Sequence, residues 1–320
     1  MTTSAEAVDR PDEHAAQPRP DSPTSLAVGL VQLARPRQWI KNLLVFVAPA
    51  AAGSLFHHSV FWHAAAAFGI FCLAASGTYC LNDALDAAGD RAHPTKQRRP
   101  VAAGVVTVPL AVVMGVVLMG LSIGLGQVVA GWHLALVMAV YVLINVGYSL
   151  GLKNEPVLDL AAVSAGFVLR AVAGGVATGV ILTNWFLIVA SFGSLLIVTG
   201  KRSGEKQLLS EHRADDGPIR PTLGLYTPSF LRSVRTLSAA VTVTAYCLWA
   251  FDRASQIHRG ADPIWFQLTV IPFTIALLHV MLLLDSGEGA APEDLAVHDH
   301  RLQVYGLCWV ALFAAGVYAT

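Results

Sequence analysis

Three aspartates and one asparagine recur at helical spacing in the stretch NDALDAAGD, as Asn82, Asp83, Asp86 and Asp90. At about 100° per residue these side chains share one arc of a helix, so their oxygen atoms converge. Carboxylates this close repel one another unless a cation joins them, and Mg²⁺ commonly bridges carboxylates to substrate phosphates. The spacing predicts a magnesium site for a phosphorylated substrate. The alternative is a solvated helix end whose acids pair with the basic residues that follow.

Basic residues follow directly, in DRAHPTKQRRP. Lys96, Arg98 and Arg99 are candidate clamps for phosphate oxygens, although anchoring of the chain at a membrane face explains any one of them equally well. His93 precedes Pro94 at the predicted helix exit, where it is either an orienting group of the site or only a turn residue. The chemistry expected of this segment is therefore binding of a phosphorylated substrate next to the acidic cluster.

A second, shorter cluster lies in YSLGLKNEPVLDLAAVSAGFVLR. Tyr148 is placed at a helix end and Lys153 in a tight loop, and Pro156 opens the next helix, as prolines often do. Asp159 and Arg170 then fall on one face of that helix, so we expect Asp159 to join the metal ligands and Arg170 to bind phosphate. An arginine inside an apolar helix indicates function by default, with a structural ion pair as the alternative.

Further cations lie at two other predicted helix ends. Lys41 is near the start of the first predicted span, and Lys201 with Arg202 follows the sixth, in VTGKRSGEK. They are candidate ligands for an anionic substrate or lipid. Topology anchoring and compensation of a helix dipole explain them as well.

The elements that position these residues are predicted to be transmembrane helices. The chain is 55% hydrophobic and 13% charged, with a mean hydropathy of +0.57, outside the range of an ordinary soluble domain. A span needs about 20 apolar residues, and nine segments qualify. They are 39–55, 60–82, 104–127, 131–150, 157–180, 182–200, 229–251, 263–284 and 302–319.

The remaining organisation is simple. Residues 1–24 lack the apolar core of a signal peptide and are predicted to form a disordered cytoplasmic tail, and 25–320 form one domain of nine transmembrane helices. A formal net charge of zero gives no indication of nucleic-acid binding. Runs of Ala and Gly favour close packing of helices and permit homo-oligomers.

The distribution of positive charge predicts the orientation. With nine spans, eighteen of the 21 Lys and Arg residues fall on one side and only Arg253 and Arg259 on the other. The positive-inside rule then places the N-terminus and the acidic clusters at the cytoplasmic face of the plasma membrane.

These motifs resemble the UbiA superfamily of intramembrane transferases. NDALDAAGD matches that superfamily's NDxxDxxxD motif, and the match covers nearly all of the chain after the tail. The resemblance implies an all-α bundle of nine helices with a cavity at the cytoplasmic side, where two acidic motifs bind a diphosphate through Mg²⁺. Aromatic prenyltransferases of the superfamily usually carry DxxxD as the second motif, whereas Val163 follows Asp159 here. That departure weakens an ordinary prenyltransferase assignment.

The flanking motifs are similar to those of one branch, the decaprenyl-phosphate phosphoribosyltransferases. They are RPRQWIKNLLVFVAP, DRAHPTKQRRP, YSLGLKNEPVLD and GKRSGEK. This resemblance implies phosphoribosyl pyrophosphate as the donor and a polyprenyl phosphate as the acceptor, in the synthesis of cell-wall arabinan in actinobacteria. The nearest alternative is transfer of an isoprenoid diphosphate to an aromatic acceptor. A transporter is a further alternative, but the acids gather at one membrane face instead of forming a relay.

Overall fold

The fold was analysed in a computed structural model, which describes residues 25–93, 95–211, 221–256, 264–286 and 298–318. The predicted disordered tail, 1–24, lies outside the described residues. Every regular element in the described part is a helix. The α-helices are α1 (Leu26–Ala34), α2 (Val47–Ala51), α3 (His58–Arg91), α4 (Val108–Leu150), α5 (Leu158–Thr178), α6 (Asn184–Glu211), α7 (Pro221–Leu225), α8 (Pro228–Gln256), α9 (Ile264–Leu268), α10 (Val270–Asp285) and α12 (His300–Tyr318). The 3₁₀ helices are η1 (Pro36–Phe46), η2 (Lys96–Arg98) and η3 (Leu152–Asn154).

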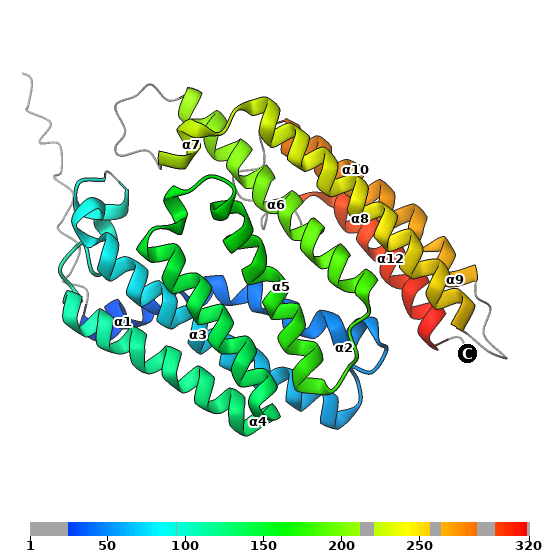
Figure 1. The fold of residues 1–320 in the computed structure, drawn as a ribbon, viewed down its shortest axis with the longest axis horizontal. Helices are drawn as coiled ribbons and strands as arrows, with labels where there is room; N and C mark the ends of the chain where they lie inside the picture. The colour runs from blue at the N-terminus through cyan, green and yellow to red at the C-terminus, as the bar shows by residue number, and fades with distance from the viewer. Residues whose placement is uncertain (1–24, 94, 212–220, 257–263, 287–297, 319–320) are drawn as a thin grey trace, which may run out of the picture.

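The helix α4 consists of two antiparallel limbs. Its backbone leaves helical geometry at Ala130 and Gly131, and Gly131 has a φ of 67°, which glycine adopts at no steric cost. The limbs then pack so closely that a Cβ on Gly126 would lie 3.3 Å from the backbone nitrogen of Ala135. Figure 1 shows the chain reversing at this point. The limbs correspond to the predicted spans 104–127 and 131–150.

Six helices of the described part are long and apolar enough to cross a bilayer. They are His58–Arg91, Val108–Leu150, Leu158–Thr178, Asn184–Gln207, Pro228–Ser255 and Ile264–Asp285. The all-α membrane architecture is confirmed, whereas nine spans stay a prediction. The predicted span 302–319 corresponds to α12, which is not among the six, although it is 19 residues long. The predicted span 39–55 is broken into η1 and α2, because polar residues such as Lys41 and Asn42 interrupt its apolar run.

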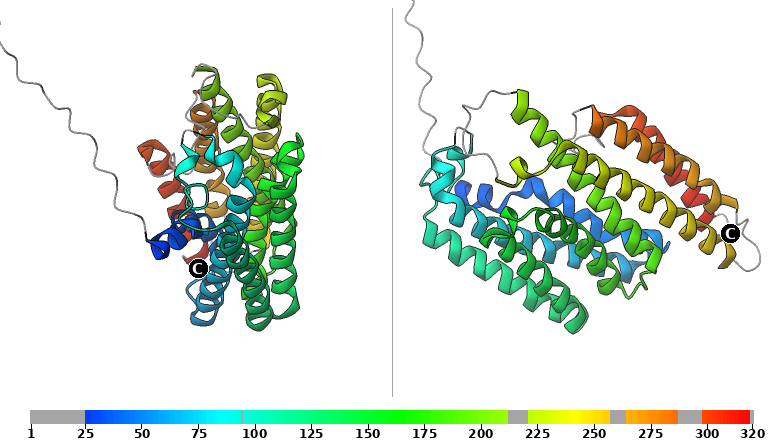
Figure 2. Two further views of the ribbon diagram at one scale, coloured as in Figure 1. Left: turned by 90° about the vertical axis from the view of Figure 1, so that its left-hand side faces the viewer. Right: turned by 45° about the horizontal axis from the view of Figure 1, so that its top comes forward.

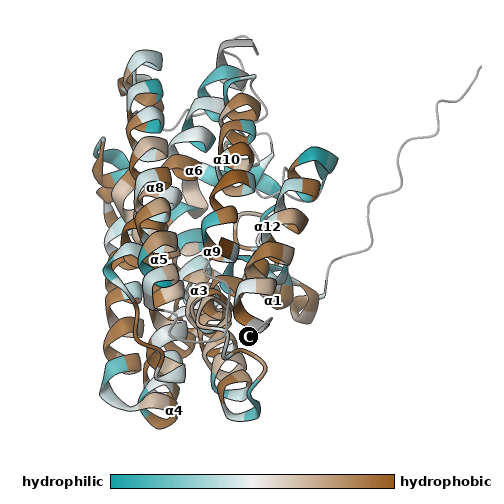
Figure 3. Cartoon of the chain, turned by 90° about the vertical axis from the view of Figure 1, so that its right-hand side faces the viewer, coloured by the Kyte–Doolittle hydropathy of each residue, from teal (hydrophilic) through white to brown (hydrophobic). Residues whose placement is uncertain are grey.

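The bundle has two parts with different arrangements (Figures 1 and 2). In the first part, η1 packs against α3 and α5, and α4 packs against the same two helices. In the second part, α6, α8, α10 and α12 run alongside one another. Figure 3 shows apolar residues along most of the helical length and hydrophilic ones mainly toward helix ends. Val113, Val116 and Val117 on α4 are each more than half exposed, as expected of side chains that face lipid tails.

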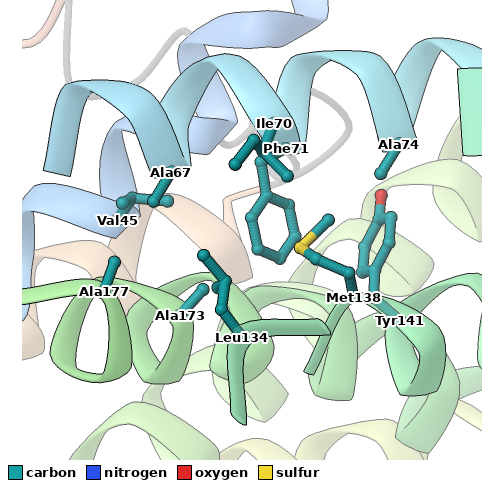
Figure 4. Close-up of a cluster of buried hydrophobic side chains, with 10 residues drawn as sticks. All are labelled: Val45, Ala67, Ile70, Phe71, Ala74, Leu134, Met138, Tyr141, Ala173 and Ala177. Atoms are coloured by element: carbon teal, nitrogen blue, oxygen red, sulfur yellow. The ribbon is translucent and has the colours of Figure 1, made fainter. Parts of the chain in front are cut away.

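The core of the first part depends on small residues that bring backbones together. Phe71 of α3 and Tyr141 of α4 pack edge to face at 4.9 Å between ring centroids, among small residues such as Ala67 and Ala173 (Figure 4). A Cβ on Gly174 of α5 would overlap the Val45 carbonyl oxygen of η1. The expected close packing through Ala and Gly is thus present, and it holds η1 deep within the bundle.

Candidate active site

A polar cavity of about 560 Å³ opens at the end of the bundle where α3 and the second limb of α4 finish. It is bounded by α3, α4 and the loops that contain η2 and η3. Its lining residues are Arg35, Thr78, Tyr79, Asn82, Leu85, Asp86, Gly89, Asp90, His93, Lys96, Arg99, Asn145, Tyr148, Ser149, Lys153 and Asn154. Eight of the residues predicted for the site therefore meet here: Asn82, Asp86, Asp90, His93, Lys96, Arg99, Tyr148 and Lys153.

Asp86, the middle one of the three aspartates on α3, connects the first acidic motif to Lys153 in the loop of the second. Lys153 donates from Nζ to Asp86 Oδ1 at 2.6 Å, and Asn82 donates from Nδ2 to the other oxygen at 3.0 Å. Ser149 on α4 donates to Asn82 Oδ1 at 3.3 Å. The Asp86 side chain is 31% exposed and that of Lys153 is 21% exposed. Both charges are therefore in contact with the cavity and with each other.

The two flanking aspartates are held by arginines. Asp83 is 2% exposed, and its Oδ1 accepts from Arg35 Nη2 at 2.6 Å and from Arg99 Nη1 at 3.2 Å. Arg99 Nη1 also donates to Asp90 Oδ2 at 2.7 Å. Three cations thus neutralise three carboxylates on one face of α3. The sequence-based alternative, in which the acids pair with nearby basic residues, describes part of this arrangement.

The donor set of this face suits a hard divalent cation. Asn82, Asp83, Asp86 and Asp90 offer oxygen atoms as acceptors, which are the ligands that Mg²⁺ prefers, and a substrate phosphate would supply further oxygen atoms. Within the described residues, however, no three His, Cys, Asp or Glu side chains form a ready-made metal cluster. The ligand assignment therefore stays a prediction.

Asp159 is placed differently from the α3 aspartates. It is fully buried at the start of α5, and Arg202 of α6 grips both oxygens, from Nε at 2.7 Å and from Nη2 at 2.8 Å. Tyr148 donates to Asp159 Oδ1 at 3.0 Å, and Glu205 accepts from Arg202 Nη1 at 2.8 Å. Asp159 and Arg202 are not part of the cavity wall, whereas Tyr148 is. Asp159 and Arg202 form a buried ion pair that holds the Tyr148 hydroxyl in place. Their predicted roles as metal ligand and phosphate clamp stay predictions.

Arg170 lies deeper, beside a smaller cavity of about 120 Å³ that it lines together with Lys41. Its three nitrogens donate to neutral acceptors, which are Asn42 Oδ1 at 2.7 Å, the Gly166 carbonyl at 2.6 Å and Tyr141 Oη at 3.2 Å. The expected structural alternative was an ion pair, but polar uncharged groups take that place. Tyr148 lines both this cavity and the larger one.

The other predicted substrate-binding residues divide into two groups. His93 and Lys96 line the main cavity, and His93 Nδ1 accepts from the Thr95 backbone N–H at 3.3 Å, as a turn residue does. Arg98 is exposed and Lys201 is half-buried, and neither lines that cavity. The structure therefore brings Lys96 to the site but not Arg98 or Lys201.

Sequence reasoning missed Arg35 and Asn42. Arg35 joins α1 to η1 with a φ of 52°, and its guanidinium lies 4.8 Å from the ring centroid of Tyr79 as well as on Asp83. Asn42 is fully buried on η1. Both belong to the quoted motif RPRQWIKN, so the signal was present. The sequence did not show that η1 enters the bundle and places the residues of that motif against α3 and α5.

A strap formed by α7 and the turn after it, residues 221–227, holds the loop of the second motif. Tyr226 is 2% exposed and its Oη accepts from the Val157 backbone N–H at 3.1 Å. Val157 has a φ of 69°, an unusual conformation for a β-branched residue that must be held by its surroundings. Thr222 donates to the Lys153 carbonyl at 3.4 Å. The strap therefore holds the backbone at two points between Lys153 and Asp159.

Comparison with known proteins agrees with this architecture. The family model described as "UbiA prenyltransferase family" matches residues 43–307. The chain is 44% identical over 299 residues to a decaprenyl-phosphate phosphoribosyltransferase of Corynebacterium glutamicum, covering 92% of this chain and 89% of the relative. It is 45% identical over 311 residues to the protein of that name from Mycolicibacterium smegmatis, covering 95% and 96%.

Solved structures share the fold at low sequence identity. A UbiA homolog from Archaeoglobus fulgidus bound to GPP and Mg²⁺ superimposes with a TM-score of 0.62 at 18% identity, covering 91% of this chain and all of that one. The same homolog bound to DMAPP and Mg²⁺ gives a TM-score of 0.63 at 19% identity, with 91% and 99% covered. These similarities establish the arrangement of helices.

Proposed function

Because the chain belongs to the UbiA prenyltransferase family, we propose that it transfers the 5-phosphoribosyl group of phosphoribosyl pyrophosphate to a polyprenyl phosphate such as decaprenyl phosphate, with release of pyrophosphate. Two curated relatives with that acceptor and group in their names match nearly full length at 44% and 45% identity. The observation that carries the proposal is the cavity lined by two carboxylates, Asp86 and Asp90, together with Arg35, Arg99 and Lys153. The third carboxylate, Asp83, is buried behind this wall and binds both arginines. A donor with two phosphorylated ends needs both kinds of group.

The α3 face would hold Mg²⁺ through Asp83, Asp86, Asp90 and Asn82, with the diphosphate as its partner. When bound, the ion would neutralise the negative charge that develops on the departing diphosphate. Arg99 and Lys153 lie directly on these carboxylates and would shift to phosphate oxygens as the donor binds. Guanidinium groups match phosphate oxygens in bidentate geometry, and Lys acts as a point charge.

The acceptor needs no dedicated base, because a phosphate monoester is already ionised at neutral pH. An oxygen of the lipid phosphate attacks C1 of the ribose on the face opposite the diphosphate. The new C–O bond forms as the bond to the diphosphate breaks, which inverts the anomeric centre. Lys41 and Arg170 line the smaller cavity next to Tyr148 and are the candidates for binding the lipid phosphate.

The same proposal places the protein in the plasma membrane with nine spans and its cavity toward the cytoplasm, where phosphoribosyl pyrophosphate is made. Support comes from the positive-inside distribution of Lys and Arg. The product would feed assembly of cell-wall arabinan. Glu155 lies just before the start of α5 and Ile181 just after its end. Cysteine-accessibility labelling at these two positions tests the orientation. Glu155 should react only from the cytoplasmic side.

The direct test is incubation of the purified full-length protein with labelled phosphoribosyl pyrophosphate, decaprenyl phosphate and Mg²⁺. Lipid-linked label and release of pyrophosphate are expected, and both should stop when EDTA removes the metal. Turnover of an isoprenoid diphosphate with an aromatic acceptor, and no labelled lipid, would establish the alternative prenyltransferase function. Activity in detergent without an ion gradient separates either enzyme from a transporter.

A further inference from the structure

A second cationic site lies away from the main cavity, where α6, α8 and α10 meet at the outer surface. Arg235 of α8 is 7% exposed, and its Nη2 donates to Asp285 Oδ1 at 2.9 Å. Its Nη1 is buried and has no hydrogen-bond partner among the residues that the structure describes. A charged donor buried without an acceptor is unfavourable. An acceptor that binds from outside would stabilise this side chain.

Two hollows meet at this arginine. One has a volume of about 280 Å³ and contains Lys206 of α6, and the other has about 490 Å³ and contains Leu278 and Leu282 of α10. Arg232, Arg235 and Asp285 line both hollows. They form one continuous surface groove, defined here as the α8–α10 groove, with a polar end and an apolar end.

The charges of the polar end favour an anion. Arg232 is exposed, and Lys206 is held by the carbonyls of Leu223 at 3.0 Å and Tyr226 at 2.5 Å. With Arg235, they place three cations around a single lining carboxylate, that of Asp285, whose side chain is 59% exposed.

The apolar end favours a lipid over a soluble anion. Leu278 and Leu282 of α10 are 60% and 62% exposed, one turn apart on the side of a helix long and apolar enough to span the membrane. The cations lie near the ends of α6 and α8, beside the last residue of α10, where the headgroups of a bilayer spanned by these helices would lie. The groove thus offers a phosphate-binding end at the headgroup level and an apolar strip that descends into the bilayer.

We propose that the α8–α10 groove binds an anionic glycerophospholipid. The headgroup phosphate accepts from Arg235 Nη1 and from Arg232, and an acyl chain lies along Leu278, Met281 and Leu282. A second copy of the chain is a poorer occupant, because its surface would have to present both an anion and an apolar strip at this depth. The site shares no lining residue with the main cavity.

The test is native mass spectrometry of the full-length protein titrated with phosphatidylglycerol or with phosphatidylcholine of the same acyl chains. The wild type should bind phosphatidylglycerol about tenfold more tightly. Arg232→Gln and Arg235→Gln should each remove most of this preference, and Asp285→Asn should increase it by removing the competing carboxylate. Arg253→Gln, on the same helix but at its other end, is the matched control and should leave binding unchanged.

Because Arg235→Gln changes a buried residue, the exposed Arg232 and Asp285 decide the outcome if that variant does not fold. Equal binding of the two lipids, or unchanged preference in both exposed variants, would overturn the proposal. Displacement of phosphatidylglycerol by millimolar inorganic phosphate would identify a soluble-anion site instead. Stronger competition by decaprenyl phosphate would identify a docking site for the substrate, which also contradicts the proposal.

Discussion

Asp86 on α3 and Asp159 on α5 both pair with a cation from another helix or loop, yet their surroundings differ. The Asp86 side chain is 31% exposed at the wall of the main cavity and binds Lys153, which is 21% exposed. Asp159 is fully buried, and its partner Arg202 is 4% exposed and occupies both of its oxygens. One pair is accessible to a substrate, and the other is sealed within the bundle.

The difference indicates separate roles for the two acidic motifs. A partly exposed ion pair contributes little to stability and exchanges partners readily. A buried pair contributes little net free energy when intact but costs much when one partner is removed. We therefore expect the first motif to act on substrate and the second to fix Tyr148 and α6 around it. Substitutions on each side of the comparison test this expectation.

The largest effect is expected for Asp86→Asn. The substitution keeps the shape of the side chain and removes the charge that would hold the metal ion and its diphosphate, so turnover should fall at least about 100-fold. Unfolding temperature should change little, because the side chain is accessible to water. Transfer of labelled phosphoribose measures the activity. Glu155→Gln, an exposed carboxylate at the same end of the bundle, is the control and should remain active.

Asp159→Asn should act on stability first. Loss of the carboxylate leaves the Arg202 guanidinium buried without its main counter-charge, at a cost of about 3–5 kcal/mol. Denaturant unfolding in detergent measures this loss. The double variant Asp159→Leu with Arg202→Met removes both charges and should be more stable than Asp159→Asn. A single variant as stable as the wild type, with activity alone lost, would instead support Asp159 as a metal ligand.

Tyr148→Phe should give a smaller change that affects both regions. Its hydroxyl donates to Asp159 at 3.0 Å while the ring lines the main cavity. Loss of one hydrogen bond to a buried carboxylate is expected to cost about 1.5 kcal/mol. The KM for the donor should rise, because the ring is no longer tethered. An unchanged stability would show that Arg202 alone is sufficient to hold Asp159.

Much of the first motif could be predicted, because helical spacing is local information. Asn82, Asp86 and Asp90 share the cavity as their phase on α3 requires. Lys153 could be assigned to the site but not to Asp86, since the contact joins residues 67 positions apart. Arg35 was missed for the same reason. Its pairing with Asp83 depends on the path of η1 through the bundle, which is set by tertiary packing at positions such as Gly174.

The membrane class could be predicted from hydropathy, whereas burial within the bundle could not. Arg170 was predicted to bind phosphate because an arginine in an apolar helix indicates function. Arg202 was predicted to do so because it follows the sixth predicted span on the same side as the acidic clusters. In the structure Arg170 is satisfied by Asn42, Tyr141 and a carbonyl. Hydropathy treats the bundle interior and the lipid alike, so it cannot report which polar residues already have partners inside.

Lys153→Gln should have the smallest effect on stability and a clear effect on the donor. The Lys153–Asp86 pair is open to the cavity, so its loss should change the free energy of unfolding by less than about 1 kcal/mol. The ammonium is nevertheless expected to bind a donor phosphate, so KM for phosphoribosyl pyrophosphate should rise about tenfold, with a smaller change in kcat.

Lys201→Gln is the matched control, because Lys201 is half-buried and does not line the main cavity; its KM should match the wild type. Lys153→Arg separates charge from shape. If arginine restores KM, a positive charge at this position is sufficient for binding the donor. If Lys153→Gln unfolds the protein as readily as Asp159→Asn does, the two ion pairs are equivalent and the separation of roles between the two acidic motifs is wrong.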